Sequence, residues 1–448
     1  MSALNRRRLL TATGLGVAAA AAPIGVSNAA AAPAAPGAMA AATAAAPAMP
    51  AASVSTGFEV LAAQEFSALR GRKLGIITNP TGVDAQLRSI VDVMHRTGAL
   101  NIVGIFGPEH GFRGTAQAGG SEGTTKDPRT GLTVYDAYGA GVSKMTELFR
   151  TAGVDTVLFD IQDAGARFYT YIWTMFTAMQ AAIAVNAEFV VLDRPNPLGG
   201  KADGPMMTPA FTSGVGAGLI VQQHGMTVGE LARYYDGELL PDVAGGRLRK
   251  LTVVPMTGWR PDMRYADTGL AWVPPSPNMP TPDTALLYPG TGMFEGVVLT
   301  EGRGTTRPFE ILGAPFVDYR WAEAVAAQRL PGVRIRECYF TPTFGKFTGE
   351  VCGGVQVHLD DIQAVQAIPL AIHLLVAARQ LYPEFGWRKD SWDPQRPYWI
   401  DKLTGSTRLR EQITAGASAT AVVSAYQREL SAFKVRRQRY LLYPGGRP

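Results

Sequence analysis

The sequence predicts an α/β protein in which a Rossmann-like parallel-sheet domain (residues 58–284) precedes a smaller α+β domain (residues 285–448). In the first domain, apolar segments are each followed by a polar turn that contains Gly or Pro, and then by a helical stretch. These segments are continuous and β-branched, which is typical of strands buried on both faces of a parallel sheet. After residue 318, helices and strands alternate with few polar clusters.

The elements follow from these patterns in chain order. Strands are predicted at residues 73–77, 102–106, 156–160, 189–193 and 249–256. Crossover helices are predicted at 85–97, 144–151 and 171–185, and a capping box at Thr227 and Glu230 starts a further helix through residue 235. The second domain is expected to hold helices at 319–328, 364–382 and 415–435 and strands at 333–340 and 353–359.

The N-terminal region differs in composition from the rest of the chain. Residues 5–10 (NRRRLL) resemble a twin-arginine export signal and precede a modestly apolar stretch, so we interpret residues 1–29 as a signal peptide. A retained membrane anchor is the alternative, but Gly and Pro make the stretch a weak spanning helix. Residues 30–57 are Ala/Pro-rich and are expected to be a linker. The predicted destination is outside the cytoplasmic membrane.

Composition restricts the function. The 448 residues are 46% hydrophobic and 18% charged, which indicates a folded globular chain rather than a disordered one. The formal charge of +5 includes three arginines of the predicted signal. Removal of the signal leaves about +2, so we expect no nucleic-acid partner.

Polar residues follow the predicted strands at their C-terminal ends, where open α/β sheets bind ligands. Glu109 comes directly after a buried strand, with no helix to stabilise, so we expect it to be functional. Helix capping or pairing with Arg167 could equally explain Asp160 and Asp163, and a rigid turn could explain Asp193 with Arg194. The predicted rim collects Asn79, Glu109, His110, Arg113, Asp160, Asp163, Arg167, Asp193, Arg194 and Asn196.

Later segments add further candidates. His224 could line the rim, and the proline-rich residues 274–282, which include Asn278 and follow Trp272, are expected to form a wall of the cleft or a hinge. Arg303 and Arg307 suit a carboxylate or phosphate, although pairing of Arg303 with Glu301 is the simpler explanation. A group of C-terminal aromatic residues could bind sugar, but we interpret it as core; it comprises Trp387, Trp392, Tyr398 and Trp399.

Seven of these segments, in order, resemble the exo-β-N-acetylmuramidase (NamZ) family, from about residue 58 to the C terminus. They are TNPTG (78–82), GPEHGFRG (107–114), DIQD (160–163), DRPNP (193–197), HGMT (224–227), the run 274–282 and EGRGTT (301–306). The resemblance implies a Rossmann-like catalytic domain, a C-terminal domain and removal of terminal β-linked N-acetylmuramic acid from the non-reducing end of peptidoglycan fragments. It also implies a catalytic glutamate at Glu109.

Glycoside hydrolysis needs an acid at the leaving oxygen and a second group. We assign the acid to Glu109, with His110 beside it, and leave the second role open among Asp160, Asp163, Glu301 and the substrate's own acetamido group. The lactyl carboxylate of muramic acid calls for a guanidinium, for which Arg303, Arg307 and Arg113 are candidates. Trp272, Trp173 and Tyr169 could stack on the sugar ring.

Other function classes remain as alternatives. A nucleotide-dependent enzyme is disfavoured because no strand-to-helix turn carries G-x-G-x-x-G. Asp160 and Asp163 could hold Mg²⁺ in a metal-dependent hydrolase, but we expect no cofactor and no metal. A non-catalytic glycan-binding protein would not need the clustered acids. Cys338 and Cys352 fit one disulfide or two buried thiols equally well.

Overall fold

The fold begins earlier in the chain than the sequence predicts. The computed structural model describes residues 54–115, 120, 123–389 and 393–445, which belong to one compact unit. The predicted signal peptide and residues 30–53 of the predicted linker lie outside these residues. Residues 54–57 are not linker, because Val54 is buried against Met256, Trp259 and Tyr443, and Thr56 caps the first helix in a capping box with Glu59.

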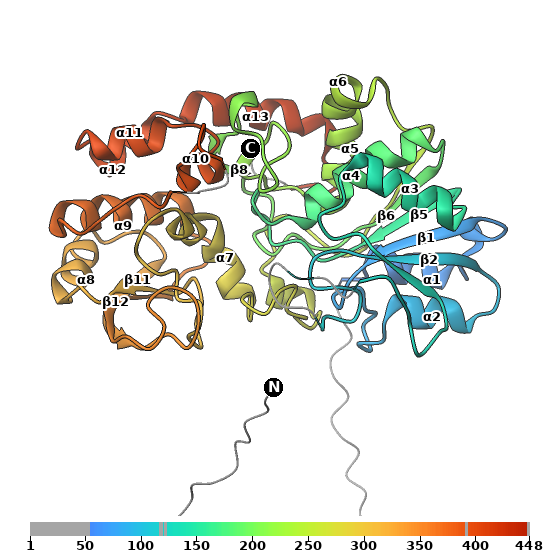
Figure 1. The fold of residues 1–448 in the computed structure, drawn as a ribbon, viewed down its shortest axis with the longest axis horizontal. Coiled ribbons are helices and arrows are strands. Elements are labelled where there is room, and N and C mark those ends of the chain that lie inside the picture. The colour runs from blue at the N-terminus through green and yellow to red at the C-terminus, as the bar shows by residue number, and fades with distance from the viewer. Residues whose placement is uncertain (1–53, 116–119, 121–122, 390–392, 446–448) are drawn as a thin grey trace, which may run out of the picture. The chain divides into compact units, whose positions relative to one another are not determined.

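A mostly parallel sheet organises the N-terminal half, as predicted (Figure 1). Its order is β3-β4-β2-β1-β5-β6-β9, and only the β3–β4 pair is antiparallel. Because β1 lies between β2 and β5, the strand order reverses there. The strands are β1 (Lys73–Thr78), β2 (Asn101–Gly107), β3 (Thr125–Lys126), β4 (Thr133–Asp136), β5 (Thr156–Asp160), β6 (Glu188–Leu192) and β9 (Leu251–Val254).

Both faces of this sheet are buried, which explains the continuous apolar runs. In β5, Leu158 packs into the hydrophobic cluster on one face, whereas Val157 and Phe159 pack into the cluster on the other. Figure 1 shows α1 and α2 on one side of the sheet and α3, α4 and α5 on the other. These helices are α1 (Gly57–Ala63), α2 (Ile90–Arg96), α3 (Val142–Ala152), α4 (Tyr171–Ala184), α5 (Val228–Tyr234), followed by α6 (Leu240–Ala244).

The predicted elements of this half are confirmed, and the structure adds α1, α6 and several short strands that were not predicted. Thr227 and Glu230 form the predicted capping box of α5, and α4 is buried along most of its length. The short strands β3 and β4 were not predicted, because a segment as brief as Thr133–Asp136 has too few residues to show a period. A two-stranded antiparallel ribbon, β7 (Asp203–Met206) with β8 (Val221–Gln223), lies outside the main sheet.

The C-terminal half carries a three-stranded antiparallel sheet of order β10-β12-β11. The predicted helix 415–435 is instead two helices, α12 and α13, separated at residues 425–426. Cys338 and Cys352 lie on neighbouring strands as buried free thiols. The elements are α7 (Pro282–Thr291), β10 (Ile311–Ala314), α8 (Tyr319–Ala326), β11 (Val333–Phe340), β12 (Cys352–Leu359), α9 (Ala367–Leu381), α10 (Trp399–Thr404), α11 (Arg408–Thr414), α12 (Ala419–Ser424) and α13 (Gln427–Arg437).

One hydrophobic cluster continues from the main sheet into the C-terminal half. It includes Phe159 of β5 and Trp321 of α8. Among the described residues, no helix is both long and apolar enough to span a membrane.

Candidate active site at the strand-order reversal

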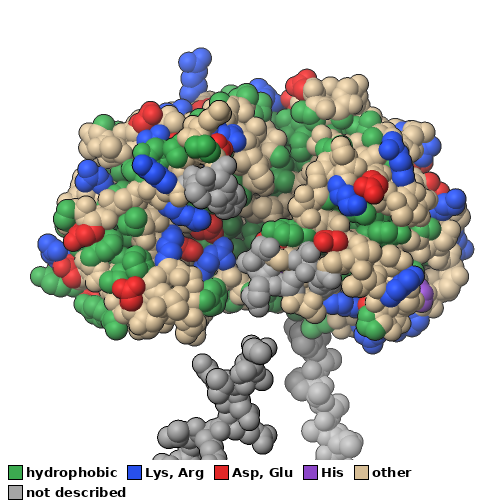
Figure 2. Space-filling view, viewed as in Figure 1, with side chains coloured by type: hydrophobic (Ala, Val, Ile, Leu, Met, Phe, Trp, Pro, Cys, Tyr) green, Lys and Arg blue, Asp and Glu red, His purple; other side chains and the backbone are tan. Residues whose placement is uncertain are grey.

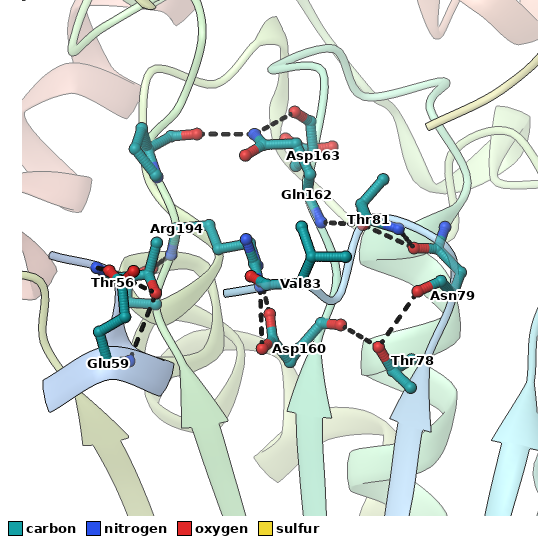
Figure 3. Close-up of polar contacts among 12 residues, drawn as sticks. Thr56, Glu59, Thr78, Asn79, Thr81, Val83, Asp160, Gln162, Asp163 and Arg194 are labelled. Carbon is teal, nitrogen blue, oxygen red and sulfur yellow. Dashed lines mark hydrogen bonds and ion pairs between the residues drawn. The ribbon is translucent and has the colours of Figure 1, made fainter. Parts of the chain in front are cut away.

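The loops after β1 and β5 meet at the strand-order reversal. Figure 3 shows Asn79 and Asp163 above the strand ends, with Thr81 and Gln162 between them. Thr81 donates from Oγ1 to Asn79 Oδ1 at 2.6 Å, and the main-chain N–H of Gln162 donates to Thr81 Oγ1 at 2.9 Å. These bonds join the two loops into one rim, at the place where open α/β sheets bind ligands.

Glu109 is half-buried in the turn after β2. Thr170, the N-cap residue of α4, donates from Oγ1 to Glu109 Oε2 at 3.1 Å. The Tyr171 hydroxyl lies 3.3 Å from the Glu109 carbonyl oxygen and donates to the Pro275 carbonyl at 2.7 Å, so the proline-rich segment lies against this turn. His110 has a φ of 70°, a conformation that non-glycine residues rarely adopt and that concentrates at functional sites.

Asp163 and His224 form a buried pair. The His224 Nε2 lies 3.0 Å from Asp163 Oδ2, and the Met226 amide donates to His224 Nδ1 at 3.2 Å. Because Nδ1 accepts a hydrogen bond, the ring proton lies on Nε2 and is donated to Asp163. The Gly165 amide also donates to Oδ2, whereas Oδ1 is buried and has no hydrogen-bond partner among the described residues. Such an oxygen is costly and calls for an explanation, for which function is one.

Buried tyrosines connect the two carboxyl groups. The Tyr169 ring meets Tyr171 edge-to-face at 5.4 Å and Tyr288 at 5.8 Å between centroids. Burial raises the pKa of Tyr169 well above its ordinary value, and the negative charges of Asp163 and Glu109 raise it further. Tyr169 is therefore within electrostatic reach of both carboxylates.

Glu109 lines a cleft of about 640 Å³, within the range of small-molecule sites. Trp173 of α4 lies on one side of it, and Arg396, Trp399 and Lys402 come from the C-terminal half. Figure 2 shows a hollow between the two halves, with Lys and Arg side chains gathered on one side. The remaining lining residues are Ala137, Tyr138, Gly139, Ala140, Gly141, Thr170, Thr174, Thr177, Ser213, Gly214, Val215, Ala217 and Asp393.

Arg396 is held in place by several contacts. Its Nε donates to Asp393 Oδ2 at 2.8 Å, and its Nη1 donates to the carbonyls of Ala210 and Thr212 at 3.1 and 2.9 Å. Lys402 Nζ lies 3.4 Å from the same Asp393 oxygen. Desolvation would raise the pKa of Asp393, but the hydrogen bonds from Arg396 and Lys402 outweigh it and lower this pKa, so Asp393 is ionised.

No sequence pattern indicates Arg396 and Lys402, which lie far along the chain from Glu109 and in no motif. Trp399, interpreted as core, packs half-buried against the main hydrophobic cluster, as do Trp387 and Tyr398, and it also lines the cleft; Trp392 lies outside the described residues. In the sequence, the feature that could have marked Trp399 is its position between the cationic residues Arg396 and Lys402.

Asp160 and Arg194 have a structural role instead of the predicted catalytic and substrate-binding roles. Arg194 binds the Asp160 carboxylate through both Nε and Nη2, and its Nη2 also donates to the Val83 carbonyl at 2.9 Å (Figure 3). The Asp160 side chain is fully buried and that of Arg194 is 6% exposed. The ion pair therefore joins the loops after β1, β5 and β6.

Asp193 also holds the fold together. Its carboxylate accepts hydrogen bonds from the Thr227 hydroxyl at 2.7 Å, the Tyr443 hydroxyl at 2.6 Å and the Gly229 amide at 2.8 Å. Burial raises the pKa of Asp193 to about 7, although the hydrogen bonds oppose this shift. Asp193 thus connects β6, α5 and the C-terminal segment, and does not face the cleft.

Asn196 and Arg167 likewise bond to the main chain. Asn196 Nδ2 donates to the Met226 carbonyl at 2.9 Å. Arg167 is fully buried and donates to the carbonyls of Ile220 and Leu403, both at 2.8 Å, so it fastens the two halves together. Arg167 forms no ion pair with Asp160 or Asp163, although such pairing was one explanation that the sequence offered for these two acids. It does not line the Glu109 cleft either.

The three arginines expected to bind the lactyl carboxylate lie elsewhere. Arg113 forms ion pairs with Asp92 at 2.8 Å and Asp127 at 3.0 Å. Arg307 lies 3.3 Å from the Glu310 carboxylate, and Arg303 pairs with acidic side chains. None of the three lines the cleft that contains Glu109.

Glu301, one of the expected second groups, is bound by cations. Lys346 Nζ lies 2.9 Å and Arg303 Nε 3.3 Å from its carboxylate oxygens. Burial alone would raise the pKa of Glu301, but these two cations outweigh it and lower this pKa. The ion pairing expected between Arg303 and Glu301 is therefore present.

Trp272 and Asn278 stabilise the proline-rich segment. The Trp272 Nε1 donates to the Met279 carbonyl at 3.0 Å, and its ring meets Tyr265 edge-to-face at 4.9 Å. The Asn278 amide nitrogen of the main chain lies 3.4 Å from Ser276 Oγ. Neither side chain lines the Glu109 cleft. Across the part of the chain that the structure describes, no group of three or more His, Cys, Asp or Glu could hold a metal ion.

The fold and this rim define a doubly wound α/β protein with a carboxyl-bearing cleft beside the carboxyl ends of β2 and β4. Comparison with known families then identifies it: the model of the exo-β-N-acetylmuramidase NamZ N-terminal domain matches residues 74–283, and that of the C-terminal domain matches residues 286–443. The chain belongs to the exo-β-N-acetylmuramidase NamZ family.

Individual relatives agree with this membership. The chain is 41% identical over 392 residues to the peptidoglycan β-N-acetylmuramidase NamZ of Bacillus subtilis (strain 168), covering 87% of this chain and 91% of that protein. Crystal structures of two DUF1343 family proteins from Bacteroides fragilis NCTC 9343 have the same fold. One has a TM-score of 0.79 at 34% identity and the other 0.69 at 29%, and they cover 88% and 87% of this chain and 100% and 99% of their own.

Proposed function

We propose that the protein is an exo-acting glycosidase that removes terminal β-linked N-acetylmuramic acid from the non-reducing end of peptidoglycan fragments. The observation that carries this proposal is the position of Glu109. In a chain of the NamZ family, this glutamate lines a cleft of about 640 Å³, with cations and a tryptophan on the opposite wall.

Glu109 is the proposed general acid. It donates a proton to the glycosidic oxygen as the bond from the anomeric carbon to that oxygen breaks, so the leaving sugar departs as an alcohol. The Thr170 hydroxyl and the buried turn fix the direction of the carboxyl group. Positioning of this kind is what makes proton transfer from a side chain effective.

Asp163 is the proposed second group. Asp160 and Glu301 are engaged in ion pairs, whereas Asp163 retains one oxygen with no hydrogen-bond partner among the described residues. That oxygen takes the proton of a water that attacks the anomeric carbon, or accepts a hydrogen bond from the substrate's acetamido N–H when the acetamido oxygen attacks instead, and His224 holds the other oxygen in place. The rim thus provides an acid and an acceptor from two different loops, although Asp163, unlike Glu109, does not itself line the cleft.

A pair of disaccharides tests the proposed function. The mature protein is incubated with N-acetylmuramyl-β-1,4-N-acetylglucosamine and with the reversed disaccharide, each with and without a chelator. We expect free N-acetylmuramic acid from the first substrate alone, at a rate that the chelator does not change. Loss of turnover with the chelator would favour a metal-dependent hydrolase, and binding without turnover would favour a glycan-binding protein.

We also propose that the protein is exported and acts outside the cytoplasmic membrane on muropeptides or disaccharides. The support is the composition of residues 1–29, in particular the three consecutive arginines Arg6, Arg7 and Arg8 before an apolar stretch. Substitution of these arginines by lysine in the full chain is expected to leave the protein inside the cell. Unchanged export of that variant would contradict the proposal.

A further inference from the structure

We propose that Arg396 binds the lactyl carboxylate of the terminal sugar and thereby sets the preference for muramic acid over glucosamine. This inference rests on the proposed function. N-Acetylmuramic acid differs from N-acetylglucosamine by an O-lactyl group, which carries one carboxylate. A site that selects the former must therefore offer a positive charge near the sugar.

The position of Arg396 matches this need. Arg396 and Lys402 are the cationic side chains among the described residues that line the cleft with Glu109. On their wall, these two cations are balanced by one carboxylate, that of Asp393. The charged residues that line the cleft therefore sum to one positive charge when Glu109 is protonated as the acid, and the substrate brings one negative charge.

Accessibility distinguishes the two cations. The Arg396 side chain is 34% exposed, whereas that of Lys402 is 5% exposed, and its ammonium lies 5.5 Å from the centre of the Trp399 ring. Lys402 is therefore enclosed in the wall, where it helps to position Asp393. Arg396 is the cation that a substrate in the cleft can reach.

The guanidinium of Arg396 is also preorganised. Its Nε and Nη1 are bound by Asp393 and by two carbonyls of residues 210–212, whereas no hydrogen bond to a described residue engages its Nη2. A guanidinium held by two of its nitrogens loses little conformational entropy when a carboxylate binds the third. Substrate binding at Nη2 leaves these three hydrogen bonds available to hold the guanidinium.

The same contacts connect Arg396 to the loop that continues from Thr212. The cleft is lined, directly after the two carbonyls that Arg396 binds, by Ser213, Gly214, Val215 and Ala217. Ser213 Oγ is buried there without a hydrogen-bond partner among the described residues. Arg396 therefore joins the C-terminal half to a loop of the N-terminal half that lines the cleft.

The test uses three aryl β-glycosides: that of N-acetylmuramic acid, that of its lactyl methyl ester, and that of N-acetylglucosamine. Each is assayed with the full mature chain and with the variants Arg396→Ala and Arg396→Lys. Arg320→Ala is the matched control, because Arg320 pairs with Asp318 on α8 and does not line the cleft.

We expect the unmodified protein to lose about 10- to 100-fold in kcat/KM between the acid and the methyl ester, as for one hydrogen bond to a charged group. Arg396→Ala should abolish this difference by lowering kcat/KM for the glycoside with the free carboxylate alone. Arg396→Lys should keep part of the difference, and Arg320→Ala should keep all of it. The ratio between substrates is insensitive to the fraction of folded enzyme, so a poorly folded variant does not obscure the result.

Two outcomes separate the levels of the proposal. If the unmodified protein cleaves the muramic acid glycoside but does not distinguish it from the ester, the role of Arg396 is refuted while the proposed function stands. The same conclusion follows if the Arg396→Ala variant still distinguishes the acid from the ester. If it cleaves none of the glycosides or the disaccharides, the proposed function fails and the role of Arg396 fails with it.

Discussion

His224 Nε2 donates a hydrogen bond to Asp163 Oδ2 across 3.0 Å, while Oδ1 of the same carboxylate has no partner in the described part of the chain. A carboxylate with one oxygen fixed and the other unsatisfied is suited to accept a hydrogen from a reacting group. This asymmetry separates Asp163 from Asp160, whose two oxygens are both bound by one arginine.

We predict that Asp163→Asn lowers kcat by about 100-fold or more, because the amide fills the same volume but carries no negative charge to accept a proton. The melting temperature should change by only a few degrees. The matched control is Asp160→Asn, three residues earlier at the end of β5, which should lower stability more than the activity of the folded fraction. An Asp163→Asn variant with unchanged turnover would show that Asp163 has no role in the mechanism.

The buried ion pair between Asp160 and Arg194 predicts a large loss of stability. Arg194→Met leaves the Asp160 carboxylate buried without its partner, which typically costs about 3–5 kcal/mol. Urea unfolding measures this change. Adding Asp160→Asn to that variant should recover part of the loss, because the unpaired charge is then removed, and a single variant as stable as the original protein would refute the structural role of the pair.

The contact between Thr170 and Glu109 predicts a smaller effect on catalysis. Thr170→Val keeps the shape of the side chain but removes the hydroxyl that donates to Glu109, so kcat/KM should fall by about two- to tenfold. Thr146→Val serves as a control, because its hydroxyl donates to the Val142 carbonyl within α3. Equal effects of the two substitutions would show that the Thr170 contact is not specific to catalysis.

Asp193 predicts a pH dependence of stability. Its pKa is raised from an ordinary value of 3.8 to about 7, first because of burial, so the folded state favours the protonated acid. The corresponding stability is complete below about pH 4 and is lost as the pH rises toward 7, by up to about 1.4 kcal/mol per pH unit. Asp193→Asn, compared with the original protein by urea unfolding at pH 4.5 and 7.5, should lose less stability over this interval. A larger loss in the variant would reverse the assigned sign.

The sequence predicts the sheet and the rim because both depend on local pattern. Continuous apolar runs such as residues 156–160 define the parallel strands, and the chain order of such strands places Glu109 and Asp163 at the same edge. The capping box at Thr227 is equally local.

The sequence does not predict which rim residues are free to act. Asp160 and Asp163 lie in one tetrapeptide and differ only in the partners that the fold brings to them, an arginine for the first and a histidine for the second. Arg396 is absent from the predicted site for a related reason. Its proximity to Glu109 arises from long-range packing of the C-terminal half, and no spacing or motif records it.

The most direct test of the account is a comparison of turnover and binding for Glu109→Gln. The amide occupies the same position but has no acidic proton, so the account predicts a fall in kcat of about 100- to 10,000-fold on the muramyl disaccharide, with substrate affinity within a few-fold of the original. A Glu109→Gln protein that releases N-acetylmuramic acid at the original rate would contradict the central claim that Glu109 is the acid.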